Sequence, residues 1–219
     1  MGRDVEAVVA VIGAGFSGVV TAVRLLRSLT PQPIRVVMFN RSGPFARGVA
    51  YGTNSPNHLL NVPAGRMSAF PEDPGHFARF AAERDPSVTP TAFVRRSVYG
   101  EYLGHLLADA VASGPNRLDR VVDGVTGVEP VQSGVIVRTE SRGDFRADHA
   151  VLAFGHQPPA DPPELPAALT RSRLYVRDPW AVGALDEVPR DRPVLLVGTG
   201  LTMFDIAIDL SARGVSGAV

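Results

Sequence analysis

A glycine-rich turn between two apolar runs, close to the start of the chain, most constrains the fold. Val8 to Ile12 is a short β-branched run of the kind buried in parallel sheets, and Phe16 to Leu29 follows with apolar residues at helical spacing. Between them, Gly13-Ala14-Gly15-Phe16-Ser17-Gly18 matches G-x-G-x-x-G. Thr30-Pro31 closes the helix, and Ile34 to Phe39 supplies a second apolar strand. The pattern predicts an α/β protein with a Rossmann-type parallel sheet.

The opening stretch from Ala7 to Val23 carries no charge, so a membrane anchor and a secretion signal are alternatives. The glycines of the turn would each weaken a continuous helix by about 1 kcal/mol relative to alanine. The preceding Arg3, Asp4 and Glu6 do not form a basic region, which a signal peptide needs. Neither alternative is favoured.

The fingerprint glycines have distinct expected roles. Gly13 permits the tight turn, Gly15 lets the backbone approach a pyrophosphate, and Gly18 allows close packing of helix on strand. The pyrophosphate would sit on the free N–H groups at the helix N-terminus. A plain glycine-rich turn in an α/β core is the alternative. An acidic residue usually reads the ribose at the end of the second strand, but here Asn40 is followed by Arg41, which could instead face a 2′-phosphate.

A second, looser fingerprint occurs near the end of the chain. Pro193 to Val197 is another apolar run that predicts a strand, and Gly198-Thr199-Gly200-Leu201-Thr202-Met203 follows it. Met203 replaces the third glycine. A helix is expected to Ala212, with Gly214 as its stop. Two such starts suggest two cofactors, although a simple strand-turn-helix remains open.

Composition narrows the classes of partner. The formal net charge is zero, so we expect neither nucleic acid nor an anionic membrane as partner. The chain has no cysteine, which excludes disulfides, zinc–thiolate sites and the redox pair of flavin disulfide reductases. We expect no metal site and a cytoplasmic location. The oligomeric state is left open.

Several segments together resemble the FAD/NAD(P)-binding protein family, a group of bacterial flavoproteins, and more distantly the class B flavin monooxygenases. They are "VIGAGFSGVV", "FARGVAYGTNSPNHLLNVPAGRMSAFPEDPGHF", "VLAFGHQPP", "YVRDPW" and "VLLVGTGLTMFDIAIDL". The resemblance implies that the first fingerprint holds FAD and the second holds NADPH or NADH.

The resemblance also implies a set of cofactor-binding residues. FAD would be held at Gly13, Gly15, Ser17, Gly18, Asn40, Arg47, Gly48 and Tyr51, with Gly155 also beside it. The stretch near the isoalloxazine ring would include His58, Leu59, Asn61, Arg66, Met67 and Ser68, and NAD(P)H would meet Gly198, Gly200, Leu201 and Thr202. Simpler interpretations remain open: solvated loop arginines at Arg47 and Arg66, a hydrogen-bonded loop histidine at His58, and plain packing of Met67 and Phe70.

The middle of the chain fits the same plan. Ser97 to Ala112 has the apolar spacing of a helix with one buried face. Val121 to Val128, Val135 to Thr139 and Phe145 to Phe154 predict strands of a small β-meander. The proline-rich run from His156 to Pro166 predicts a stiff linker. We expect an FAD-binding domain over residues 1–157, a linker over 158–191 and the start of an NAD(P)-binding domain over 192–219.

These features predict an FAD-dependent oxidoreductase that takes hydride from NAD(P)H and passes electrons to oxygen or a small-molecule substrate. A monooxygenase subtype is less supported, since the linker motif F-x-G-x-x-x-H is not present near Phe154. No catalytic side chain is predicted. Alternatives are a nucleotide-binding module without turnover and a single-site NAD(P)-dependent dehydrogenase. Gly217-Ala218-Val219 would begin another strand, so we expect the chain to be an N-terminal fragment.

Overall fold

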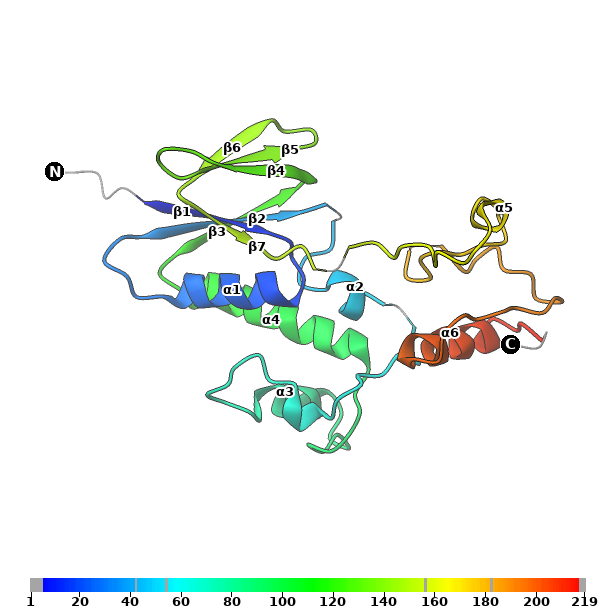
Figure 1. Ribbon diagram of the computed structural model, residues 1–219. Helices are drawn as coiled ribbons and strands as arrows, with labels where there is room; N and C mark the ends of the chain where they lie inside the picture. The colour runs from blue at the N-terminus through cyan, green and yellow to red at the C-terminus, as the bar shows by residue number, and fades with distance from the viewer. Residues whose placement is uncertain (1–5, 42, 54, 156, 182, 217–219) are drawn as a thin grey trace.

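A four-stranded parallel sheet lies at the centre of the computed structural model, which describes residues 6–41, 43–53, 55–155, 157–181 and 183–216. Its order is β3-β2-β1-β7, with β1 at Ala7–Ile12, β2 at Ile34–Asn40, β3 at Arg117–Val122 and β7 at His149–Leu152. Strands β1 and β2 pair from Ala7 against Ile34 to Ile12 against Phe39. The predicted α/β class with a Rossmann-type parallel sheet is confirmed (Figure 1).

Two helices cover one face of this sheet. Helix α1 runs over Phe16–Arg27 and α4 over Arg96–Ser113, close to the predicted helices. The two helices pack together below the sheet in Figure 1. Tyr99, Tyr102 and Leu103 of α4 are almost fully buried in a core shared with α1 and β1. Burial of this apolar surface is the main stabilising term for such a layer.

A three-stranded antiparallel sheet covers the other face, as the meander predicted. It contains β4 at Val125–Pro130, β5 at Val135–Thr139 and β6 at Asp144–Ala147. Phe145 meets Phe39 of the central sheet edge to face, with ring centroids 5.6 Å apart. This contact joins the two sheets into one core.

Two of the predicted strands are wrong in their boundaries. The expected strand from Val121 to Val128 is interrupted at Asp123-Gly124, where the chain leaves the parallel sheet for the antiparallel one. The expected strand from Phe145 to Phe154 is likewise two strands, one in each sheet. The chain changes sheets at Asp148, whose N–H donates to the Val8 carbonyl (2.9 Å) and whose carboxylate accepts from the Val8 N–H (2.7 Å). A residue paired in this way ends one strand and fixes the next.

Short helices lie between β2 and α4. They are α2 at Gly48–Tyr51, the 3₁₀ helix η1 at Ala64–Arg66 and α3 at His76–Arg84. Phe77 and Phe80 of α3 pack against Tyr102 of α4, which attaches this segment to the main core. The segment contains most of the residues that the family resemblance places near FAD.

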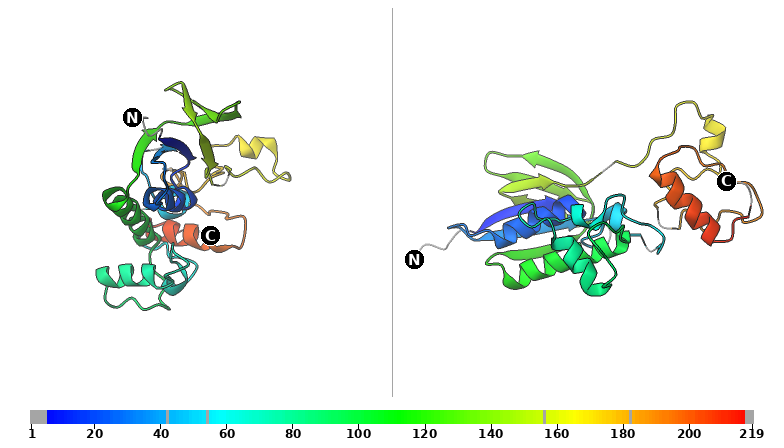
Figure 2. Two further views of the ribbon diagram at one scale, coloured as in Figure 1. Left: turned by 90° about the vertical axis from the view of Figure 1, so that its left-hand side faces the viewer. Right: turned by 90° about the horizontal axis from the view of Figure 1, so that it is seen from below.

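The second fingerprint lies on a separate small unit. A long connection containing α5, at Ala167–Thr170, leads to α6 at Leu201–Ala212, and the right-hand view of Figure 2 shows both set apart from the sheet. Ile206 and Leu210 of α6 pack with Leu185 and Val215 in their own apolar cluster. Gly214 follows the helix with a φ of 80°, as expected for its stop. His156, at the start of the predicted linker, and Gly217-Ala218-Val219 lie outside the described residues.

The strand predicted over Pro193 to Val197 is wrong. The segment has no regular secondary structure and no sheet pairing, and Leu195 and Val197 are 86% and 76% exposed. A parallel strand needs neighbours on which to hydrogen-bond, and no other segment in the described ranges pairs with this one. As for membrane spans, the described helices include none with the length and hydropathy to cross a bilayer.

Candidate functional site

The first fingerprint forms a tight turn between β1 and α1. Gly13 has a φ of 108°, and its N–H donates to the Phe39 carbonyl at 2.9 Å. A Cβ at Gly13 would lie 2.2 Å from the Ala153 carbonyl oxygen, and a Cβ at Gly18 would lie 1.9 Å from the Gly13 carbonyl oxygen. Both positions are therefore closed to any side chain, because backbone atoms occupy the space.

Gly15 differs from its two neighbours in the motif. It precedes α1 in an extended conformation, and a Cβ there would meet only the Gly48 Cα, at 3.8 Å. No side chain among the described residues caps the helix, its first turn has no acidic residue, and Ser17 is exposed there. The first N–H groups of α1 are left to an outside acceptor, and the helix dipole favours an anion. The protein itself therefore does not require Gly15 to be small, and its approach to a pyrophosphate stays a prediction.

The loop after β2 folds over this turn. Ala46 adopts a φ of 67° and its N–H donates to the Ala14 carbonyl at 3.0 Å. Gly48 has a φ of 59°, and a Cβ there would be 3.1 Å from the Gly15 Cα. Arg47 between them is half-buried, and its guanidinium has no ion pair or hydrogen bond within the described residues. The structure therefore places Gly48, with Arg47 next to it in the chain, at the fingerprint turn, and their contact with a pyrophosphate stays a prediction.

Tyr51 ends the same short helix. Its ring lies 4.5 Å from that of Tyr99, between centroids, and burial raises the pKa of Tyr51. A Cβ at Gly100 would lie 2.6 Å from the Tyr51 carbonyl oxygen. Tyr51 therefore fastens the loop to α4, and its contact with a pyrophosphate stays a prediction.

The ribose-reading candidates both have partners in the protein. The Asn40 side-chain amide donates to the Pro44 carbonyl at 2.8 Å, within the loop after β2. Arg41 is exposed and lies 3.2 Å from a Glu140 carboxylate oxygen. Asn40 therefore shapes the loop that covers the fingerprint, whatever it does for a ligand.

The stretch expected near the flavin ring lies between α2 and α3, with unequal exposure. Leu59, Asn61 and Arg66 are exposed, while Met67 packs against the main core. The Ser68 hydroxyl is engaged locally, since it donates to backbone carbonyls and accepts from the Phe70 N–H at 3.0 Å. Contact of these residues with a flavin stays a prediction, for which the exposed members are the better placed.

His58 is the exception in that stretch, because it is buried. Its Nδ1 lies 2.7 Å from the Thr53 hydroxyl. Its Nε2 lies 3.1 Å from an Asp209 carboxylate oxygen of α6, although not in the direction of a hydrogen bond. These are the contacts of a loop histidine held by neighbours.

Sequence reasoning missed the residues that join α6 to this loop. Arg96, at the start of α4, donates to Asp205 of α6 at 2.6 Å and to the Leu59 carbonyl at 2.9 Å. Trp180 covers the contact, with its ring 5.2 Å from that of His58. Arg96 and Asp205 are 109 positions apart, so no local pattern could have paired them.

The second fingerprint repeats the backbone of the first. Gly198 has a φ of 125°, against 108° at Gly13. Gly200 precedes α6 with φ and ψ of −84° and 178°, against −80° and −166° at Gly15. Leu201 and Thr202 are exposed at an uncapped helix start that, like that of α1, has no acidic residue in its first turn. The same turn is therefore built twice, the second time with Met203 in place of the third glycine.

Gly155 lies just beyond β7, at the same end of the sheet. It has a φ of 75°, and a Cβ there would meet nothing within 4 Å. The close backbone approach at this strand end is instead made by Gly13 against Ala153. Gly155 is thus needed for its backbone conformation in the protein, and its nearness to FAD stays a prediction.

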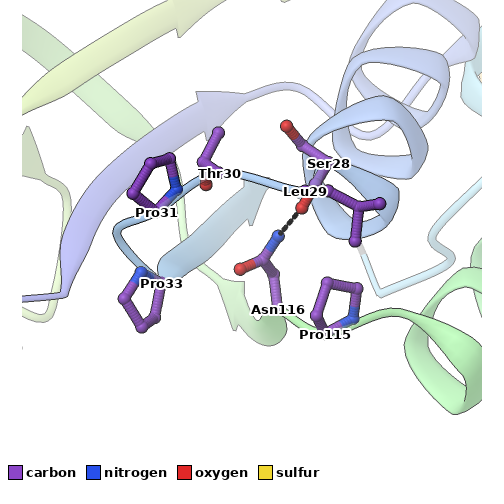
Figure 3. A pocket seen from close by; sticks show the side chains of 7 residues that line it. All are labelled: Ser28, Leu29, Thr30, Pro31, Pro33, Pro115 and Asn116. Carbon is purple, nitrogen blue, oxygen red and sulfur yellow. Dashed lines mark hydrogen bonds between the residues drawn. The ribbon is translucent and has the colours of Figure 1, made fainter.

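A hollow of about 360 Å³ lies at the end of the sheet opposite the fingerprint turn. Figure 3 shows that residues after α1 and before β2 and β3 line it, with Asn116 bonded to the Ser28 carbonyl at 2.9 Å. Ligands of open parallel sheets bind at the carboxyl ends of the strands, whereas this hollow faces their amino ends. We therefore assign it no role in the site.

The fold and its fingerprint turn define an α/β dinucleotide-binding protein. A family described as FAD-NAD(P)-binding matches residues 10–157. The chain belongs to this family, and FAD and NAD(P) are accordingly its cofactors.

Solved structures agree in fold. Bacillithiol disulfide reductase from Staphylococcus aureus matches with a TM-score of 0.61 and 14% identity, over 97% of this chain and 55% of the reductase. A closed structure of cyclohexanone monooxygenase matches with a TM-score of 0.55 and 22% identity, over 94% of this chain and 36% of the monooxygenase. A mutant cyclohexanone monooxygenase from Rhodococcus sp. Phi1, bound to NADP⁺, matches with a TM-score of 0.50 and 22% identity, over 74% and 28% respectively. No curated protein matches the sequence significantly. The chain thus spans 55% of the reductase's length, and 36% and 28% of the lengths of the two monooxygenases.

Proposed function

We propose that the chain binds FAD at the first fingerprint and NAD(P)H at the second, as part of an NAD(P)H-dependent flavin oxidoreductase. The repeated turn carries this proposal, since Gly13 and Gly15 share their backbone conformation with Gly198 and Gly200. Each turn presents uncapped N–H groups at the start of a 12-residue helix, where a pyrophosphate is stabilised.

The residues around the first turn fit FAD. The space beside Gly15 is open, so a phosphate can approach the backbone there. The guanidinium of Arg47, which has no partner among the described residues, can supply charge-assisted hydrogen bonds to that phosphate. Asn40 holds the covering loop through Pro44, and exposed Asn61 and Arg66 offer polar groups to the remainder of the cofactor.

When bound, FAD accepts hydride from reduced nicotinamide and passes the electrons on, and the protein's share is to bind, orient and exclude water. In this chain Ser17 and the first turn of α1 bind the pyrophosphate of FAD, and Gly48 and its loop cover it. Leu201 and Thr202 perform the equivalent task for the nicotinamide nucleotide. We propose oxygen or a small-molecule substrate as final acceptor, with oxygenation of nitrogen or sulfur as the finer possibility.

The test is the visible absorption spectrum of the purified chain with FAD, followed by NADPH under anaerobic conditions. Gly15→Val should abolish the bound-flavin spectrum and leave the far-ultraviolet circular dichroism unchanged. The valine side chain would occupy the open space that the proposal gives to the pyrophosphate. Gly104→Val on α4 is the control, since a Cβ there meets nothing within 4 Å and a Cβ at Gly15 meets only the Gly48 Cα at 3.8 Å. Flavin retained by the folded Gly15→Val protein would refute the first site. A bound flavin that NADPH does not bleach would favour a binding module over an oxidoreductase.

A further inference from the structure

One shielded ion pair, Arg96–Asp205, and one buried contact between His58 and the Asp209 carboxylate connect the small unit that carries α6 to the body of the protein. The Arg96 and Asp205 side chains are 16% and 12% exposed, and those of His58 and Asp209 are 3% and 16% exposed. Every other ion pair between described residues has a partner at least 37% exposed. Charged groups withdrawn from water are weakened little by salt and hold a defined geometry.

The acidic partners share one face of α6, since Asp205 and Asp209 are one helical turn apart. Asp205 meets Arg96, whose Nε also donates to the Leu59 carbonyl at 2.9 Å. Asp209 accepts from the Ser55 hydroxyl at 2.6 Å and lies beside His58. One helix face is therefore fixed to both α4 and the loop that the proposed function places near the flavin.

Apolar packing does not provide this attachment. Ile206 and Leu210 belong to the cluster of the small unit, which shares no residue with the main core. Leu201, Phe204 and Ile208 of α6 are all more than 40% exposed. The contact between the two parts thus depends on polar groups, with the Trp180 ring over Arg96 and against His58.

We propose that Asp205 and Asp209 with Arg96 and His58 form a polar latch, which sets the position of the second fingerprint relative to the first. The four are positioning residues, because they act through α6 and the loop. The latch rests on the proposed function for its role in hydride transfer, but its existence is independent of any cofactor. Since the second fingerprint opens α6, releasing the latch would let the NAD(P) site move away from the FAD site.

The test measures the distance between α4 and α6 in the full chain without cofactor. Because the sequence has no cysteine, Ala112→Cys and Ala212→Cys place spin labels uniquely on two exposed helix positions. Pulsed electron resonance should give one narrow distance distribution. Asp205→Asn with Asp209→Asn should broaden it. Glu101 lies on α4 with Arg96 and forms an ion pair with Arg84 of α3. Glu101→Gln removes that pair and should leave the distribution narrow.

An unchanged distribution in the double variant, or a broad one in the parent chain, would overturn the latch. If the double variant does not fold by circular dichroism, Asp209→Asn alone is measured, with iodide quenching of Trp180 as a second readout. That tryptophan is the single one in the chain and lies at the junction. Anaerobic flavin reduction by NADPH separates the two proposals. If the distance broadens in the variant but NADPH does not reduce the flavin of the parent chain, the latch is retained and the proposed function is rejected. If the parent chain and the variant reduce flavin at equal rates, the latch has no part in hydride transfer.

Discussion

Alanine at the second and third fingerprint glycines, Gly15 and Gly18, should lower stability to very different extents. A Cβ at Gly18 would lie 1.9 Å from the Gly13 carbonyl oxygen, whereas real Cβ atoms essentially never come within 3.0 Å. The turn would have to open by about 1 Å against β1 and Ala153, in a layer that is otherwise tightly packed. Overpacking of this kind costs about 3 kcal/mol, and the clash is with backbone that cannot rotate away.

At Gly15 the same substitution meets only ordinary contact, since the nearest atom is the Gly48 Cα at 3.8 Å. Its φ of −80° is open to every residue. Alanine is a weaker N-cap than glycine but restricts the unfolded chain, so the net change should be about 1 kcal/mol or less.

Urea denaturation followed by circular dichroism at 222 nm would measure both variants against the parent chain. We expect a large drop in the midpoint for Gly18→Ala and a small one for Gly15→Ala, with equal slopes. Comparable losses at the two positions would refute the assignment of Gly18 to packing and Gly15 to ligand approach. A stable Gly18→Ala protein would do the same.

Further predictions concern pH and the strand corners. Burial first, then Tyr51 and Tyr102 nearby, raises the pKa of Tyr99, so the folded state favours its neutral phenol. This stability is fully present below the unfolded pKa of about 10 and is lost as pH rises above it towards the folded value. Tyr99→Phe should therefore unfold less than the parent chain above about pH 10 by circular dichroism; an unaltered alkaline transition would contradict this. Asn40→Asp should lower the free energy of unfolding by about 1–2 kcal/mol, because a carboxylate would face the Pro44 carbonyl where the amide now donates; tighter folding would contradict that donor role. Asp148→Ala should cost about 1 kcal/mol in urea denaturation through the lost Val8 N–H bond, and a cost near zero would show that water replaces it.

The elements predicted well are those with local signals. The β1–α1–β2 unit combines β-branched runs, a glycine turn and a proline stop, and its observed bounds differ from the prediction by at most two residues at each end. The boundary between β3 and β4 also had a signal, since Asp123-Gly124 is a turn dipeptide that the strand prediction ran through. The corner at Asp148 had none, because its pairing with Val8 spans 140 positions.

The candidate site divides in the same way. The glycines and the loop at Arg47 and Gly48 were placed near one another by a motif and a family resemblance, and the structure brings them together. The partners of His58 could not be predicted, since Asp209 is far along the chain and carries no motif. Residues that join two parts of a protein are selected by tertiary geometry, and their types alone do not distinguish them from a solvated helix face.

A comparison of the two fingerprints shows that the glycine turn forms without a paired strand before it. The turn at Gly198 and Gly200 forms although Val194 to Val197 pairs with no strand in the described part of the chain, so its conformation follows from the glycine dihedrals and the helix start. The run before it lacks the ladder that fixes β1 between β2 and β7. Without a paired strand before it among the described residues, the second turn depends on α6 for its orientation, and α6 in turn depends on Asp205 and Asp209. The polar latch is therefore the link through which the position of the proposed NAD(P) site is determined in this chain.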